Sequence, residues 1–442
     1  QLIYQIFLGG YFMKFRRLLL LGLVSLLLIA LVGCGSGSEK SSDGGSGGGS
    51  EGEEVTLRIS IWNNNPEGTK LEQEIFQVFE EQNPGVKIEV VTSPYNEYNQ
   101  KIMTMAAGNE APDLIWLQPA AFAEFVNNGL IVDLTDKMSE LDTDEFLPGI
   151  LELGQIDGKQ YALLRDASAF QLGYNKDMFD EAGVPYPEDD WTWDDFIEIG
   201  KQLTKFDEDG RPLQFGMENY YTDEILVQNG ARILSEDGST VLVDSPEAIE
   251  AIAFGRDLIH KHQIQPTAEQ AQGISGGMFL SGLAAMKMMG PWDWQDTNKN
   301  ADFAWDVVPL PAGKGGNVAA AAYLPIGIST QSEHPDVAWE FLKFLTYGEG
   351  QDIQMDKINA IPVVKRNMDQ ILDMEGAPDN AVSLVHMLEE GRTVQNAPYV
   401  PEYNEIKNKA QTVFDNINLN NLDPEPELKK LADEIREEFG KQ

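Results

Sequence analysis

The sequence predicts an α/β fold, and three observations support this class. Short stretches that alternate apolar and polar residues predict strands, and stretches with an apolar residue every three or four positions predict helices. Turn-forming Gly, Pro and Asn separate the two types. The chain has 442 residues, 42% of them hydrophobic, which is enough for about two or three domains. Strands that alternate with helices of this length indicate parallel β-α-β units.

The pattern begins at residue 55. Residues 55–62, VTLRISIW, alternate and predict a strand. Residues 68–85, GTKLEQEIFQVFEEQNPG, predict a helix that ends at the Asn-Pro-Gly turn. Residues 86–91 alternate again. A helix, a short buried strand and a second helix are expected to follow, over residues 95–109, 112–117 and 120–129.

The later part of the chain repeats these signals. Thr192 and Asp195 have the spacing of a capping box, which predicts that a helix begins there and covers residues 193–206. Residues 334–346 and 426–439 have the apolar spacing of two further amphipathic helices. The fold is therefore expected to be α/β along most of its length.

The balance of charge narrows the function. The chain has 32 basic and 72 acidic residues, a formal charge of -40. Such a surface repels the phosphates of nucleic acid and anionic lipid headgroups, and it favours a monomer. It also disfavours a strongly anionic ligand. The single cysteine, Cys34, excludes a disulfide within the chain.

The N-terminal residues have the order of a secretory signal peptide. From Met13 a basic segment precedes residues 18–32, a run of 15 residues without a charge. This run is short for a membrane span, which needs about 20 residues. An uncleaved membrane anchor with an incidental cysteine is the competing interpretation. Residues 1–12 lack an initial methionine, and we expect them to be upstream sequence translated in error.

The segment LVGC, residues 31–34, resembles the lipobox of bacterial lipoproteins. This resemblance implies cleavage before Cys34 and acylation of that cysteine, so we expect an extracytoplasmic protein with a lipid anchor in the cell membrane. Residues 35–54 contain eight Gly and six Ser. Such a segment does not fold by itself, and it predicts a tether with a reach of roughly 25 Å.

Three stretches resemble the extracellular solute-binding proteins of family 1, the sugar receptors of bacterial ABC importers related to maltose/maltodextrin-binding protein. They are YNKDMFDEAGVPYPEDDWTWDDFIEIGKQLT (174–204), FLSGLAAMKMMGPWDWQ (279–295) and VVPLPAGKGGNVAAAAYLPIGISTQSEHPDVAWEFLKFLT (307–346). The resemblance extends over residues 54–442.

This family implies a two-lobed, periplasmic-binding-protein-like (Venus-flytrap) fold. Each lobe is expected to be a mostly parallel sheet flanked by helices, with the ligand cleft between the lobes. The chain would cross between lobes near residues 164–169, 309–316 and 361–364. The expected divisions are a spurious extension (1–12), a signal peptide (13–33), a lipidated cysteine with its tether (34–54), lobe I (55–164 and 309–362) and lobe II (165–308 and 363–442).

The function implied is that of a substrate-binding lipoprotein. It would capture a mono- or oligosaccharide by lobe closure and deliver it to permease subunits that are separate chains. No catalysis, cofactor or metal is expected. Three alternatives stay open: a ligand sensor for a receptor kinase, a receptor for a non-sugar solute such as a polyamine or glycerol phosphate, and an extracellular glycosidase that uses two carboxylates.

Candidate binding residues follow from the chemistry of a sugar. Its C–H faces pack on aromatic rings, and its hydroxyls pair with carboxylates, amides and guanidinium groups. Ligands in α/β sheets bind beyond the carboxyl ends of strands. In the first lobe and at the first crossing, these criteria select Trp62, Asn64, Glu67, Gln118, Arg165 and Asp166. Trp116 is interpreted as a core residue, and Gln118 is preferred to it.

In the second lobe, the resemblance selects the loop MENYYTDE and the motif GPWDW. In the family, the tryptophan that follows Gly-Pro commonly packs on the sugar face, and it corresponds to Trp292. The competing interpretation makes Trp292 and Trp294 core residues, since tryptophan is highly buried on average. The alanines at 319–322 are expected to leave room for ligand. The candidates in the second lobe are Glu218, Asn219, Tyr220, Tyr221, Trp292, Asp293, Trp294 and Arg392, and Tyr323 is the candidate in residues 309–362 of the first lobe.

Overall fold

The computed structural model describes residues 54–442, except 63–65, 273, 275–276, 359–360, 375 and 396. The expected signal peptide, Cys34, the tether and Asn64 lie outside the described residues. The side chain of Glu67 is likewise not described. The helices and strands predicted after residue 54 can be compared with the structure directly.

The first sheet has six strands within the described part of the chain, in the order β13-β12-β3-β1-β2, and β6 also pairs with β12. Strand β1 (Val55–Trp62) lies parallel to both β2 (Val86–Ser93) and β3 (Leu114–Trp116). Helix α2 (Pro66–Gln82) connects β1 to β2, and α3 (Tyr95–Ala107) connects β2 to β3. The predicted parallel β-α-β units are confirmed in this sheet.

The prediction for the end of α2 is also confirmed. The helix stops at Gln82, and the Asn-Pro-Gly turn follows, with Gly85 at φ +98°. A side chain at that φ would be strained, so glycine suits the turn. After β3, a short 3₁₀ turn η1 (Pro119–Ala121) leads into α4 (Phe122–Asn127).

A small hairpin and several 3₁₀ turns follow. Strands β4 (Gln155–Ile156) and β5 (Lys159–Gln160) pair through Asp157 and Gly158, both with positive φ. Two successive positive φ values are typical of the two-residue hairpin turn whose twist matches the strands. The 3₁₀ turns are η2 (Thr135–Glu140), η3 (Thr143–Glu145) and η4 (Glu152–Gly154).

The second sheet has five strands within the described residues, in the order β11-β7-β10-β9-β8. Strand β7 (Gln171–Asn175) pairs antiparallel with both β10 (Ala284–Met289) and β11 (Trp305–Pro309). Strand β9 (Pro212–Met217) pairs parallel with β10 and antiparallel with β8 (Lys205–Phe206). The expectation of a mostly parallel sheet is therefore wrong for this sheet. Alternation along a strand shows which faces are buried and says nothing of the neighbour's direction.

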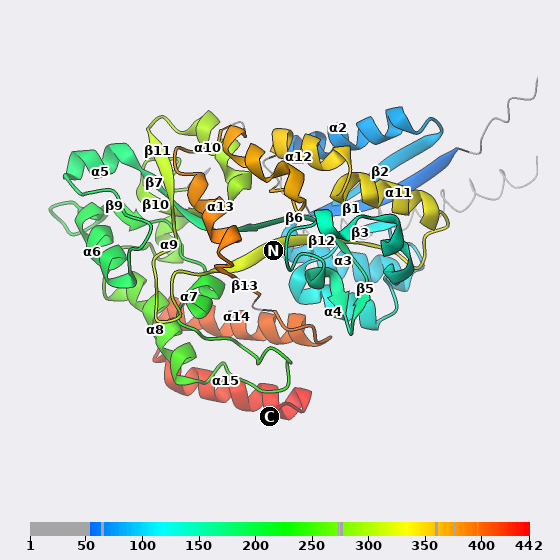
Figure 1. The fold of residues 1–442 in the computed structure, drawn as a ribbon. Coiled ribbons are helices and arrows are strands. Elements are labelled where there is room, and N and C mark those ends of the chain that lie inside the picture. Colours follow the sequence, from blue (N-terminus) through cyan, green and yellow to red (C-terminus); the bar gives the residue numbers. More distant parts are fainter. Residues whose placement is uncertain are drawn as a thin grey trace, which may run out of the picture. The chain divides into compact units, whose positions relative to one another are not determined.

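Two paired strands connect the sheets. Strand β6 (Leu163–Ala169) pairs antiparallel with β12 (Ala319–Ile328) in the first sheet, and only Phe170 separates β6 from β7 in the second. Strand β12 follows β11 of the second sheet along the chain. Figure 1 shows β6 and β12 side by side between the two groups of strands. The residue boundaries of the two lobes stay a prediction.

The remaining helices cover these sheets. The capping box at α6 is confirmed: the Thr192 N–H donates to Asp195 Oδ2 at 2.9 Å, and the Asp195 N–H donates to Thr192 Oγ1 at 3.3 Å. The helices are α5 (Lys176–Ala182), α6 (Trp193–Leu203), α7 (Thr222–Gln228), α8 (Pro246–His260), α9 (Ala268–Ala271), η5 (Pro291–Asp293), α10 (Trp294–Asn300), α11 (Pro335–Thr346), α12 (Glu349–Ile358), η6 (Lys365–Asp373), α13 (Val382–Glu389), α14 (Tyr403–Asn420) and α15 (Pro424–Phe439). The short strand β13 (Thr393–Val394) precedes α14.

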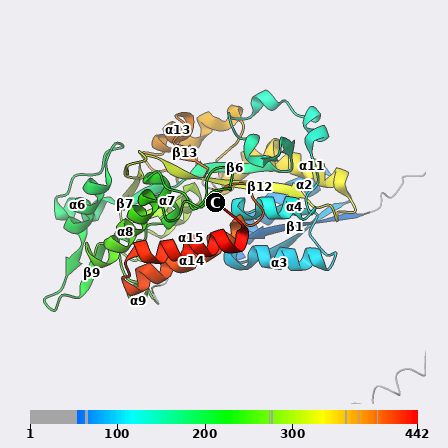
Figure 2. The ribbon, with the colours of Figure 1, turned by 90° about the horizontal axis from the view of Figure 1, so that it is seen from below.

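Each sheet has its own core. Helix α11 buries Trp339 and Phe341 against the first sheet, together with Phe76 and Phe79 of α2. Helices α14 and α15 pack on each other and belong to the core of the second sheet (Figure 2). Among the described residues, no helix combines the length and the apolar character that a membrane span requires.

Candidate functional site

A cleft of about 610 Å³ lies where β6 and β12 join the two sheets. Its lining comes from strand ends, from the connecting strands and from α2, α3, α7 and α14. The lining residues are Trp62, Glu72, Tyr95, Trp116, Pro119, Ala120, Arg165, Asp166, Ser168, Phe170, Tyr221, Asp223, Glu224, Trp292, Ala320, Ala321, Ala322, Tyr323, Leu324, Ile361, Ala397 and Lys407.

Three rings from the first sheet form what we call the first aromatic wall: Trp62, Tyr95 and Trp116. Trp62 and Trp116 end the parallel strands β1 and β3, and Tyr95 begins α3. The Trp62 ring meets Trp116 at 5.1 Å and Tyr95 at 5.5 Å between ring centroids, edge to face in both pairs. Such pairs are favourable beyond the area they bury. The wall therefore forms where parallel strands end, as ligand sites in α/β sheets do.

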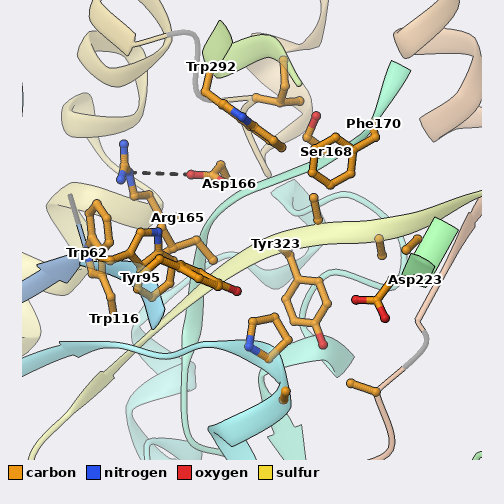
Figure 3. A pocket seen from close by; sticks show the side chains of 18 of the residues that line it. Trp62, Tyr95, Trp116, Arg165, Asp166, Ser168, Phe170, Asp223, Trp292 and Tyr323 are labelled. Carbon is orange, nitrogen blue, oxygen red and sulfur yellow. Dashed lines mark ion pairs between the residues drawn. The ribbon is translucent and has the colours of Figure 1, made fainter. Parts of the chain in front are cut away.

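Three further rings form the second aromatic wall: Phe170, Tyr221 and Trp292. The Phe170 ring meets Tyr221 at 5.2 Å and Trp292 at 5.3 Å, again edge to face. Trp292 is 47% exposed, which is unusual for a ring of this size. A Cβ on Gly290 would lie 2.3 Å from the Trp292 ring, so only glycine lets the indole fold back over that position. Figure 3 shows Trp292 and Phe170 apart from the three rings of the first wall.

Arg165 lies against the Trp116 ring of the first aromatic wall, and its side chain is only 5% exposed. Its guanidinium stacks on the Trp116 ring, with Cζ 4.7 Å from the centroid. One terminal nitrogen lies 3.0 Å from Glu72 Oε1, and Nε donates to Gln354 Oε1. The same Nε lies 3.7 Å from Asp166 Oδ2, drawn as a dashed line in Figure 3.

Two carboxyl groups, those of Glu72 and Asp166, lie beside the single positive charge of Arg165. Burial raises the pKa of Glu72, and Asp166 adds to the rise, while the Arg165 guanidinium opposes it. Burial also raises the pKa of Asp166, again opposed by Arg165. The Asp166 side chain is 18% exposed and lines the cleft. It therefore offers a hydrogen-bond acceptor to a bound molecule.

The floor of the cleft is β12. The small side chains of Ala320, Ala321 and Ala322 line it, so these positions leave space above the strand. Tyr323 follows them and is 7% exposed, with its hydroxyl 3.3 Å from that of Tyr399. Burial raises the pKa of Tyr323 well above its ordinary value, so the hydroxyl keeps its proton.

Asp223, Glu224 and Lys407 also line the cleft. The Lys407 ammonium donates to Asp223 Oδ2 at 2.6 Å, which joins α14 to α7. Burial opposes the charge of Lys407, but Asp223 outweighs it and raises the lysine pKa. Glu224 accepts a hydrogen bond from the Ala320 N–H at 2.7 Å, and burial raises its pKa to about 8. Glu224 is therefore mostly protonated at neutral pH.

The structure brings six of the residues predicted from the sequence to the cleft. Their shared feature is a position at a strand end, in a connecting strand or in a motif of the second lobe. They are Trp62, Arg165, Asp166, Tyr221, Trp292 and Tyr323. Contact of each with ligand stays a prediction.

Two other predicted residues are buried in the interior and do not reach the cleft. Trp294 begins α10 and is fully buried in the core of the second sheet. Tyr220 is 6% exposed, and its hydroxyl donates to Gln228 Oε1 at 2.9 Å. The competing core interpretation therefore fits Trp294 and does not fit Trp292.

The remaining predicted residues that the structure describes do not line the cleft. Gln118 donates to the Tyr95 carbonyl at 2.8 Å, so it supports the first wall from behind, and Trp116 takes the lining position. Asp293 accepts from the Gly290 N–H at 3.1 Å. Glu218 accepts from the Phe279 N–H at 2.8 Å, Asn219 lies beside these residues without lining the cleft, and Arg392 donates to Asn317 Oδ1 at 2.8 Å.

Several lining residues were missed. Tyr95 follows the carboxyl end of β2, so the strand-end rule could have found it. Phe170 lies in the one-residue connection between β6 and β7. An apolar residue between two strands is typical of the hydrophobic core, so no sequence pattern predicts that it lines the cleft. Glu72 and Lys407 lie on helices where local sequence gives no sign of a cleft, and Asp223 lies within the selected loop MENYYTDE but was not chosen from it.

The fold and this cleft define a two-lobed binding protein of the periplasmic type. The chain belongs to the bacterial extracellular solute-binding protein family, whose model matches residues 62–352. Among the described residues, no group of three or more His, Cys, Asp or Glu side chains is arranged to hold a metal ion.

Comparison with known proteins agrees with this family. The chain is 28% identical over 280 residues to the arabinooligosaccharide-binding protein of Halalkalibacterium halodurans, covering 60% of this chain and 61% of the relative. It is 24% identical to the galactooligosaccharide-binding protein of Bacillus subtilis, covering 92% and 93%. An ABC substrate-binding protein from Listeria monocytogenes, solved in complex with cycloalternan, matches with 27% identity and a TM-score of 0.80, covering 88% of this chain and 100% of that one.

Proposed function

We propose that the protein captures an uncharged carbohydrate in the cleft and hands it, unchanged, to a separate ABC permease. The observation that carries this proposal is the pair of aromatic walls with carboxyl groups between them. Aromatic rings pack on the C–H faces of a sugar, and carboxyl groups accept hydrogen bonds from its hydroxyls. Ligand contact with both lobes would favour their closure.

The charges in the cleft support an uncharged ligand. Among the described lining residues, Arg165 and Lys407 are the cations, and each is paired with a carboxylate. An anionic ligand would have to displace Glu72 or Asp223 from these pairs. A neutral molecule rich in hydroxyls can instead donate to Asp166 without breaking either pair.

The names of the relatives support an oligosaccharide. The Halalkalibacterium and Bacillus proteins are named for arabinooligosaccharide and galactooligosaccharide, and the Listeria protein was solved with cycloalternan. A cleft of about 610 Å³ lies in the usual range for small-molecule sites, about 300–1,000 Å³. We extend this ligand class to the present chain.

The N-terminal sequence supports the location. Lipidation at Cys34 and a tether over residues 35–54 would hold the binding body outside the membrane within reach of the permease. Mass spectrometry of protein purified from membranes tests this part, because acylation adds a mass that Cys34→Ala would abolish.

A thermal-shift screen tests the ligand class. The purified protein is heated with arabino-, galacto- and maltooligosaccharides, with spermidine and glycerol 3-phosphate as the non-sugar arms. We expect an oligosaccharide to raise the melting temperature in a concentration-dependent way, as mass action requires. A shift with only spermidine or glycerol 3-phosphate would contradict the proposal.

Product analysis tests the absence of catalysis. After prolonged incubation with the oligosaccharide that binds, a receptor returns the ligand intact, and a reducing-end assay stays at its blank value. New reducing ends that increase with time and protein concentration would indicate a glycosidase, since two cleft carboxyl groups could act as acid and base.

A further inference from the structure

Arg165 and Asp166 occupy an irregular point in the strand that connects the sheets. Ala167 pairs with Tyr323 of β12 and Leu164 pairs with Pro325, so two residues of β6 lie opposite the single residue Leu324. This arrangement is a β-bulge, a feature that redirects side chains and is frequent beside functional sites. In a regular strand, adjacent side chains point to opposite faces. The bulge lets both residues line one cleft.

The bulge is held from behind by α12. The Gln351 side chain donates to the Arg165 carbonyl at 2.7 Å and accepts from the Val363 N–H at 3.1 Å. Gln354 accepts from Arg165 Nε and donates to the Leu345 carbonyl at 2.9 Å. The backbone and the side chain of Arg165 are therefore both fixed by one helix.

The guanidinium of Arg165 is poorly accessible to a ligand. It contacts Glu72, Gln354 and the Trp116 ring, and only 5% of the side chain is exposed. Asp166, in contrast to Arg165, is accessible to a ligand. Its carboxylate lies 3.7 Å from Arg165 Nε, longer than a hydrogen bond, and it lines the cleft. A carboxylate can accept about four hydrogen bonds, so Asp166 has acceptor capacity facing the ligand space.

We propose that Arg165 is a positioning residue: it fixes the Trp116 ring behind Trp62 and leaves the Asp166 carboxylate free to accept hydrogen bonds from ligand hydroxyls. Glu72 makes this possible, because its carboxyl group lies closer to the guanidinium than the carboxyl group of Asp166 does. The inference rests on the proposed function, since it assigns the hydroxyl acceptor in the same cleft. Specificity for hydroxyl donors then depends on a carboxylate whose pKa is raised by burial and lowered by Arg165, the guanidinium that Glu72 also contacts.

The proposal predicts opposite effects of two substitutions. In Arg165→Met, Asp166 loses its positively charged neighbour, so the pKa of Asp166 rises. As the pH is lowered, ligand binding is then lost at a higher pH than in the wild type. In Glu72→Gln, Asp166 loses a like-charged neighbour that competes with it for the Arg165 guanidinium. The pKa of Asp166 therefore falls, and ligand binding persists to a lower pH. A purely structural role for Arg165 would weaken binding equally at every pH.

The experiment measures affinity by calorimetry from pH 4 to pH 8 with the oligosaccharide that gives the largest thermal shift. We expect Arg165→Met to bind at least ~10-fold more weakly at pH 7, with the acid midpoint of binding moved up, and Glu72→Gln to move it down. Arg165→Lys should keep the midpoint near wild type but lose affinity, since an ammonium lacks the planar fork and stacks poorly on an indole. Full affinity in Arg165→Lys, or midpoints that move in the same direction, would overturn the proposal.

Arg366→Met is the matched control. Arg366 also stacks on a ring, with Cζ 5.5 Å from the Tyr347 centroid, and lies 3.9 Å from Asp352, but it does not line the cleft. Its binding curve should match wild type. If Arg165→Met does not fold, Glu72→Gln and Arg165→Lys still test the direction and the geometry.

A ligand-free measurement separates the two proposals. Carbon-13 NMR of the Asp166 carboxyl follows its titration in the unliganded protein, where Arg165→Met should raise the midpoint and Glu72→Gln should lower it. If no oligosaccharide binds, the proposed function fails while this titration still tests the coupling. If an oligosaccharide binds but the Asp166 midpoint is the same in all variants, the positioning role fails alone.

Discussion

The two aromatic walls are built in different ways. In the first wall, Trp116 is 4% exposed and is clamped by the buried Arg165. In the second wall, Trp292 is 47% exposed and rests on a glycine and on the edge of Phe170. A ring fixed by buried ionic contacts is already in place before ligand arrives, and this reduces the ordering that binding requires. An exposed ring can adjust to the ligand, so Trp292 is expected to adapt more than Trp116.

The largest expected effect concerns Trp294, the buried tryptophan in the same motif as Trp292 of the second wall. Trp294 is fully buried two residues after Trp292. Trp294→Ala should lower the free energy of unfolding by about 3–5 kcal/mol, since it removes a large core side chain. Chemical denaturation measures this value. A loss below about 1 kcal/mol would show that the core assignment of Trp294 is wrong.

The next effect concerns Trp292, the exposed ring of the second wall. Trp292→Ala should weaken oligosaccharide binding by at least ~1 kcal/mol and leave the melting temperature of the unliganded protein nearly unchanged, because the ring is half exposed. Calorimetric titration gives the affinity, and Trp294→Phe is a control in the same motif that should retain it. Unchanged affinity in Trp292→Ala would remove this ring from the site.

A pH-dependent effect concerns Glu224, the carboxyl group on the helix that follows Tyr221 of the second wall. The pKa of Glu224 is raised from 4.5 to about 8 by burial. The folded state thus binds this proton more tightly than the unfolded state, so the contribution to stability is complete below pH 4.5 and is lost as the pH rises through 8. Each pKa unit by which the folded and unfolded states differ corresponds to about 1.4 kcal/mol, so a shift of this size makes stability depend strongly on pH.

Glu224→Gln removes this titration and keeps an acceptor for the Ala320 N–H. Relative to wild type, the variant should gain stability progressively between pH 5 and pH 9. Melting temperatures of both proteins at several pH values provide the test. Parallel curves across this range would mean that Glu224 is not buried as the structure places it.

The sequence predicted the fold well where its signals are local. The strands around Trp62 and Trp116, the turn at Gly85 and the capping box at Thr192 follow from periodicity and from single residues with strong preferences. The direction of the strands in the second sheet was predicted wrongly. It depends on how the chain returns from the first sheet, which no local pattern records.

The site was predicted in part for the same reason. Trp292 follows from its motif, but neighbouring residues such as Tyr220 and Tyr221 could not be told apart, since only the structure shows which of the two faces the cleft. The pair of Asp223 and Lys407 joins residues 184 positions apart. The partners of Arg165, Glu72 and Gln354, could not be read from the sequence because they come from distant helices.

The most direct test of the central claim is a crystal structure of the protein with the oligosaccharide that binds most tightly. The account predicts a sugar ring held between the two aromatic walls, with one face against Trp292 and at least one hydroxyl donating to Asp166, while Arg165 makes no contact with the ligand. A ligand bound outside this cleft, or held by the Arg165 guanidinium in place of Glu72, would contradict it.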